Sequence, residues 1–254
     1  MKSTQIYKTI FFLIIFSISI YSHKFTYANC PNGFKSPEKN FFDLNVCGDT
    51  NVSDIKLKHA STVLTNIIDY NRDGMPDNKF VLKELIDVDA TLLVISDEKY
   101  AEKYHNDSNN DEFTVVFEDE IITEGNAFDP TLEEALHLVT QFGFVRVYPL
   151  DFGEDKYSKI SEYMNIARGG YFARIPNKYP STAVYTYFDK TCDYACQITE
   201  FTYWVITSLR NQQIGNERKN EIKSEWKLYN RKKIEKEFPE LFVFFSKPKF
   251  GIIF

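Results

Sequence analysis

The chain has 254 residues, of which 43% are hydrophobic and 26% charged, and its formal net charge is −6. This length suits one large domain or two small ones. The acidic balance argues against a nucleic-acid partner, because such proteins carry clustered positive charge. The sequence contains no Walker loop, Gly-x-Ser-x-Gly elbow or Gly-x-Gly-x-x-Gly motif, which argues against the enzyme classes that depend on them.

The N-terminus has the layout of a secretory signal peptide. Lys2 and Lys8 flank the start of an apolar run from Ile10 to Ile20, and Thr26-Tyr27-Ala28 supplies small residues for cleavage. The run is about eleven residues long, whereas a bilayer span needs about twenty. We therefore predict a signal peptide over 1–28 and a single secreted domain over 29–254, extracellular, or periplasmic in a Gram-negative host. An uncleaved signal anchor is the alternative.

Cleavage would remove three lysines and no acidic residue, which takes the formal charge from −6 to −9. The mature chain contains no long apolar stretch, so we expect no membrane contact after cleavage. Four cysteines remain, and an even number in an oxidising compartment favours disulfides. Of the three possible pairings we predict the local one, Cys30–Cys47 with Cys192–Cys196. A metal site made by four thiolates is the alternative, although neither pair has the spacing of a zinc knuckle.

Hydrophobic periodicity predicts a helix over 55–68, a loop over 69–78 and a short helix over 80–86. Two runs of β-type residues, 90–95 and 113–122, predict strands. The polar stretch from His105 to Glu112 between them is predicted to be a loop.

The second half of the chain is predicted to be mostly helical. A helix that begins near Asp129 or Thr131 is expected to end at Gly143. Further helices are predicted over 158–168, 191–209 and 216–237, the last closed by Pro239. The aromatic stretch 171–190 is irregular, and it can line a substrate groove or pack the core. A small sheet followed by a mostly helical half is an α+β fold.

The loop after the first helix carries oxygen ligands at alternate positions. Asp69, Asn71 and Asp73 precede Gly74, and Asp77 adds a further oxygen, a spacing that wraps ligands around Ca²⁺. Phe80 stands where an EF-hand has its bidentate glutamate, so the loop resembles those of thrombospondin type 3 repeats more than a standard EF-hand. The resemblance predicts a calcium site. An Asx-rich turn that needs no ion is the alternative.

The helix that begins at Thr131 carries Glu133-Glu134-Ala135-Leu136-His137. This segment resembles the His-Glu-x-x-His helix of zincin metallopeptidases, in which two histidines bind zinc and the glutamate activates water. His137 matches the second histidine, Glu134 the catalytic base, and Glu133 replaces the first histidine. The resemblance to glutamate-type members implies a third ligand from a later helix, for which Glu200 is the candidate.

Glu133 in place of a histidine is a departure from the zincin motif. A site with two carboxylates and one imidazole binds Zn²⁺, but it suits Mn²⁺ or Fe²⁺ as well, and it can be inert. A di-iron site is discounted, because it needs a second Glu-x-x-His pair. Structural roles for these residues stay open, since first-turn glutamates complement a helix dipole. The sequence therefore predicts a secreted, zincin-like hydrolase of peptide or protein substrates, whose site is either active or degenerate. A secreted calcium-binding protein without enzyme activity is the alternative.

Overall fold

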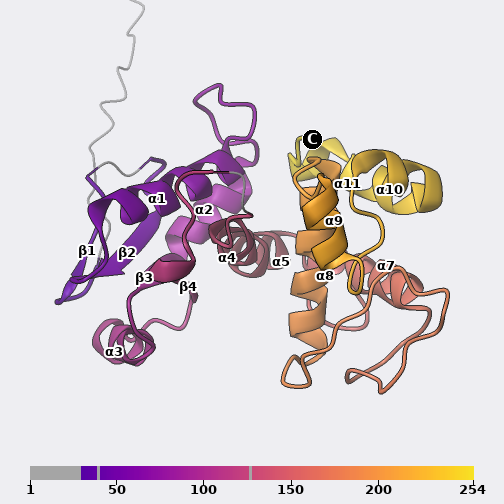
Figure 1. The fold of residues 1–254 in the computed structure, drawn as a ribbon. Helices are drawn as coiled ribbons and strands as arrows, with labels where there is room; N and C mark the ends of the chain where they lie inside the picture. The colour runs from indigo at the N-terminus through magenta and orange to yellow at the C-terminus, as the bar shows by residue number, and fades with distance from the viewer. Residues whose placement is uncertain (1–29, 39–40, 126–127) are drawn as a thin grey trace, which may run out of the picture.

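The computed structural model describes residues 30–38, 41–125 and 128–254. The predicted signal peptide and its cleavage site lie outside these residues. Among the helices of the described part, none is long and apolar enough to cross a bilayer. The architecture is α+β, as predicted, with a small mixed sheet on one side and a group of helices on the other (Figure 1).

The sheet has four short strands in the order β1-β2-β3-β4, namely Phe34–Lys35, Asn45–Asp49, Thr91–Ile95 and Phe113–Phe117. β1 is antiparallel to β2, and the other neighbours are parallel. β3 and β4 confirm the predicted strands, although β4 ends early in a 3₁₀ turn at Glu118–Glu120. β2 was not predicted. It reads Asn-Val-Cys-Gly-Asp, a composition poor in β-formers, and it forms because its neighbours bury it.

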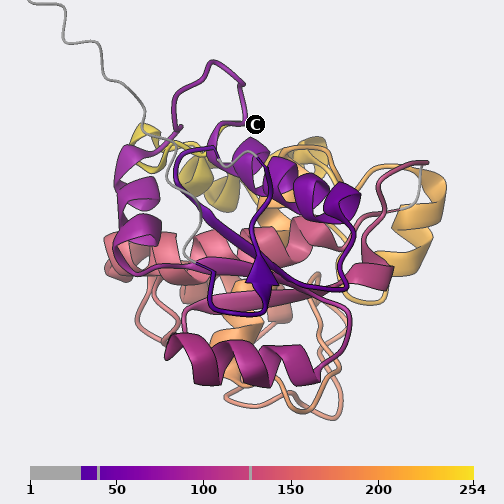
Figure 2. The same cartoon turned by 90° about the vertical axis from the view of Figure 1, so that its left-hand side faces the viewer.

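Both faces of the sheet are covered, because side chains that point alternately to the two faces of β3 pack into two different hydrophobic clusters. Leu92 and Val94 belong to the main hydrophobic core, whereas Leu93 and Ile95 pack with Tyr104 in a smaller cluster. Tyr104 lies on α3 (Lys99–Ser108), which faces one side of the sheet while α1 (Asp54–Ile68) lies on the other (Figure 2). The predicted loop over 105–112 is therefore wrong in its first half. The packing of Tyr104 against the sheet stabilises α3, whereas the polar composition of residues 105–112 had predicted a loop.

The predicted motif helix is longer than expected. α4 (Thr131–Leu138) continues through a π-helical turn (Val139–Phe144) into α5 (Val145–Val147). Gly143 does not end the helix. A Cβ at this position would lie 2.7 Å from Cγ1 of Val81 on α2 (Lys79–Asp87), so glycine permits close packing of the two helices.

The remaining helices are α6 (Pro149–Phe152), α7 (Lys159–Arg168), α8 (Tyr194–Leu209), α9 (Asn216–Ile222), α10 (Arg231–Glu237) and α11 (Pro239–Phe245), before a 3₁₀ turn at Pro248–Phe250. The predicted helix 216–237 is two helices, because the segment between them buries Trp226 completely. Pro239 begins α11 rather than closing a helix, which fits the preference of proline for a first helical position.

Both predicted disulfides are present, Cys30–Cys47 and Cys192–Cys196. The first joins the segment before β1 to β2, and the second lies at the start of α8. No cysteine of the described residues is free, so the alternative thiolate metal site is excluded.

Candidate metal centre

The site forms where α4 packs against α8, between the sheet half and the helical half. Asp129 sets the start of α4, because its Oδ1 accepts hydrogen bonds from the amide (3.1 Å) and the hydroxyl (2.7 Å) of Thr131. α8 begins at an N-cap, Asp193, whose side chain accepts from the amide of Cys196 at 2.9 Å. α8 is buried along nearly its whole length. A polar side chain of α8 that faces α4 is therefore enclosed by protein.

Glu133, His137 and Glu200 meet at this contact. Each offers one ligand atom, and these atoms all lie within 4.8 Å of one another. His137 and Glu200 are each only 9% exposed. Spacing on α4 accounts for the first two residues, since positions four apart share one face of a helix. The three residues that the zincin resemblance suggested are thus together and can hold a metal ion.

His137 has an unused nitrogen in this group. Its Nε2 is 3.7 Å from Oε2 of Glu200, which is too long for a hydrogen bond, and none of the described residues is a hydrogen-bond partner of this atom. A buried polar atom without a partner costs free energy, and native structures usually explain such an atom by an ion, a water molecule or a function. A metal ion at Nε2 fits this donor set.

Glu134 lies at the other edge of the imidazole. Its Oε2 is 3.9 Å from Nδ1 of His137, and its side chain is 32% exposed, so it faces an accessible part of the site. Its backbone carbonyl accepts a hydrogen bond of 2.9 Å from the hydroxyl of Thr114 on β4. The sheet therefore fixes the position along α4 from which Glu134 projects.

Burial changes the protonation of these groups. Burial, together with the charge of Glu133, raises the pKa values of Glu134 and Glu200 to about 8. Burial also raises the pKa of Glu133, and it lowers the pKa of His137 to about 4. At neutral pH the metal-free centre thus has a neutral imidazole and protonated carboxyl groups at Glu134 and Glu200, so His137 and Glu200 are not an ion pair. Neutral imidazole is the form that binds metals.

Four residues around the group were not predicted from the sequence. The hydroxyl of Tyr187 donates to Oε1 of Glu200 at 3.1 Å, and the ring of Tyr203 lies edge-on to His137 with centroids 5.8 Å apart. The positive charge of Arg218 lowers the pKa of Glu133, and the negative charge of Glu225 raises it. Tyr203 had a sequence signal, because it follows Glu200 by three positions on one helix. Tyr187 belongs to the aromatic stretch that the sequence analysis named as able to line a substrate groove. Arg218 and Glu225 come from distant segments and had no sequence signal.

The Asp69 loop forms a hydrogen-bond network of its own. The carboxylate of Asp69 accepts from the amides of Asp73 (3.0 Å) and Gly74 (2.9 Å), and Asp77 accepts from the amide of Tyr70 (2.9 Å). Asn71 also accepts from the amide of Asp73. These bonds form the Asx-rich turn that was the alternative expectation. Calcium binding by Asp69, Asn71, Asp73 and Asp77 stays a prediction.

Comparison of the chain with protein-family models, with curated proteins and with solved structures gives no match. The geometry and chemistry of the site are therefore the basis on which a function can be inferred.

Protonation of Glu200 predicts how the stability of the metal-free protein depends on pH. The folded state retains this proton up to about pH 8, whereas a free glutamate loses it above about 4.5. The resulting stabilisation is complete below the unfolded pKa and is lost as pH rises through 8. His137 acts in the opposite direction, but only as pH falls below about 6.5 and through 4. Between pH 6.5 and 8.5 we therefore expect the free energy of unfolding to fall.

Urea unfolding in the presence of EDTA measures this fall. Glu200→Gln should make it smaller, whereas the same change at the exposed Glu240 should leave it unaltered. Equal pH dependence in Glu200→Gln and the wild type would show that Glu200 carries no raised pKa.

Proposed function

We propose that the protein is a secreted, metal-dependent hydrolase of peptide bonds whose catalytic helix is zincin-like. One observation carries the proposal. Ligand atoms of Glu133, His137 and Glu200 lie within 4.8 Å of one another, and Nε2 of the buried imidazole has no hydrogen-bond partner among residues 30–38, 41–125 and 128–254. The two disulfides are consistent with an oxidising, extracellular location.

The donor set suggests which metals to test. Two carboxylates and one imidazole bind Zn²⁺, but oxygen-rich sites also suit Mn²⁺ and Fe²⁺. A cation there would offset the repulsion among Glu133, Glu134 and Glu200, and it would supply Lewis-acid polarisation of a substrate carbonyl and a water molecule.

The other side chains have distinct proposed roles. A cation at the centre would favour the ionised form of Glu134, which could then take a proton from water as a general base. Glu134 lies beside His137 and is more exposed than Glu200. Tyr187 positions Glu200 through its 3.1 Å hydrogen bond. Arg218 favours the ionised form of Glu133.

The mature protein is expected to bind about one equivalent of Zn²⁺, Mn²⁺ or Fe²⁺, and His137→Ala should weaken that binding by at least about 100-fold because it removes the single imidazole ligand. Mass spectrometry measures the number of metal equivalents bound, and competition with a chelator measures the metal affinity. His105→Ala is the matched control, because His105 is exposed and pairs with Asp111. Purified wild type with less than about a tenth of an equivalent of transition metal, after incubation with each ion, would refute the site.

Glu134→Gln should retain the metal but lower peptide hydrolysis by about 100-fold or more, since an amide cannot accept the proton. Cleavage of a mixture of quenched fluorogenic peptides measures the activity. Glu162→Gln, a change at an exposed residue of α7, is the control. Hydrolysis that survives Glu134→Gln would remove Glu134 from the mechanism. Metal binding without any hydrolysis by the wild type would identify the centre as degenerate.

A calcium site in the Asp69 loop is a second, independent proposal. Burial is the main cause of the raised pKa of Asp77, and the charges of Asp69 and Asp73 add to it, so the three carboxylates repel one another in a way that a cation would relieve. Millimolar Ca²⁺ should raise the melting temperature of the wild type by several degrees, and Asp73→Ala should abolish the shift. Differential scanning calorimetry measures this shift in melting temperature, and Mg²⁺ in place of Ca²⁺ is the control. An equal shift in wild type and Asp73→Ala would leave the loop as an Asx turn.

A further inference from the structure

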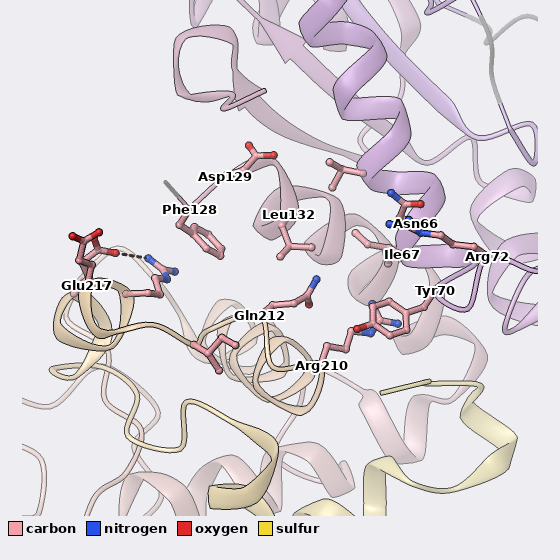
Figure 3. A pocket seen from close by; sticks show the side chains of 14 residues that line it. Asn66, Ile67, Tyr70, Arg72, Phe128, Asp129, Leu132, Arg210, Gln212 and Glu217 are labelled. Atoms are coloured by element: carbon pink, nitrogen blue, oxygen red, sulfur yellow. Dashed lines mark hydrogen bonds and ion pairs between the residues drawn. The ribbon is translucent and has the colours of Figure 1, made fainter. Parts of the chain in front are cut away.

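A cleft of about 680 Å³ opens beside the metal centre, between the end of α1, the start of α4 and the segment that joins α8 to α9 (Figure 3). Its apolar walls come from α1, from α4 and the residue Phe128 before it, and from the segment that joins α8 to α9, and they consist of Val63, Ile67, Phe128, Leu132 and Ile214. Its polar lining includes three arginines, Arg72, Arg210 and Arg218. A surface with apolar walls and a few polar groups is typical of ligand sites.

The cleft and the metal centre share a wall. Leu132, which lines the cleft, is the neighbour of Glu133 on α4. The guanidinium of Arg218 lies 3.7 Å from the centroid of the Phe128 ring, and its Nη2 is 3.4 Å from the hydroxyl of Tyr203. Tyr203 in turn contacts the imidazole of His137. A ligand in the cleft would therefore lie next to the residues that surround the centre.

Arg210 supplies a buried positive charge to this cleft. It is 8% exposed, its guanidinium stacks 4.0 Å from the centroid of the Tyr70 ring, and its Nε donates to the carbonyl of Ile253 at 3.0 Å. It forms no ion pair within 4.0 Å with any carboxylate of the described residues, and the negative charge of Asp77 acts on it from beyond that distance. Figure 3 shows it beside Tyr70, at the end of the cleft away from Phe128 and Glu217. Buried charges in proteins are usually paired, so this guanidinium fits an incoming anion.

The acidic residues of the cleft are less able to oppose such an anion. Asp129 is bonded to His59 at 2.6 Å and to Thr131, and Glu221 pairs with Arg218 at 3.3 Å. Glu217 is exposed on α9. The lining beside Arg210 is consequently apolar and positively charged, and the charge of Asp77, which is not part of the lining, offsets only part of it.

We propose that this cleft binds an apolar side chain and an adjacent carboxylate of the peptide substrate, with Arg210 as the partner of the carboxylate. The inference depends on the proposed peptidase function for its substrate class, but the binding itself requires no metal. A carboxylate beside an apolar side chain has two sources in peptides. It belongs either to an internal Asp or Glu or to the C-terminus of the chain.

Calorimetric titration of the full mature protein in EDTA tests the proposal without hydrolysis. Two pairs of acetylated peptides are compared: Gly-Leu with a free or an amidated C-terminus, and Gly-Leu-Glu-Gly-amide with its Gln counterpart. In at least one pair the peptide with the carboxylate should bind about ten-fold tighter or more. The amide peptide of that pair cannot form the charge-assisted hydrogen bond with Arg210. The pair that shows the preference identifies the source of the carboxylate.

Arg210→Gln should abolish the preference. Ile214→Glu should do so as well, since it places a negative charge at an exposed position on the lining, 58% exposed, where the fold tolerates it. Ile214→Glu decides the matter if Arg210→Gln does not fold. Arg146→Gln, at an arginine that pairs with Glu112 outside the cleft, should bind like the wild type. Equal binding of the two members of both pairs, or a preference that survives Ile214→Glu, would overturn the proposal. Absence of bound metal or of hydrolysis bears on the proposed function alone.

Discussion

The burial of several carboxyl groups around one imidazole, where α4 packs against α8, is the constraint that organises this molecule. Carboxylates in such a place repel one another and lose hydration, so the folded state must neutralise them with protons or with a cation. The raised pKa values of Glu134 and Glu200 record the first solution. The convergence of Glu133, His137 and Glu200 offers the second. With either protons or a cation, the buried polar contact is less stabilising than a purely apolar contact would be. Functional sites commonly reduce the stability of the fold that carries them in this way.

The rest of the fold supports this contact from two sides. The sheet positions α4 through the packing of α4 on β3 and β4 and through the hydrogen bond from Thr114 to the carbonyl of Glu134. The helical half encloses α8, and Tyr185 and Trp226, both fully buried, pack against Phe201 of that helix. Tyr187, two residues after Tyr185, then reaches Glu200. The aromatic stretch 171–190 therefore contributes to the core and to the site.

Sequence reasoning was most successful where one local pattern determines the outcome. Helical spacing placed Glu133 and His137 on one face of a helix. The strongly apolar runs at β3 and β4 predicted strands, because their local composition favours no other structure. Both disulfides followed from close spacing. The failures share a cause. β2, α3 and the break at Trp226 depend on burial against distant segments, which overrides local propensity. Arg218, Glu225 and Tyr187 reach the site through tertiary structure alone, as does the cleft that contains Arg210.

Anomalous diffraction from a crystal grown with Zn²⁺ or Mn²⁺ tests the central claim most directly. The account predicts a single strong peak between α4 and α8, about 2.0–2.2 Å from Nε2 of His137 and from a carboxylate oxygen of each of Glu133 and Glu200 for zinc. A well-ordered structure at saturating metal with no peak there, and with Nε2 of His137 bonded to protein or water, would contradict it.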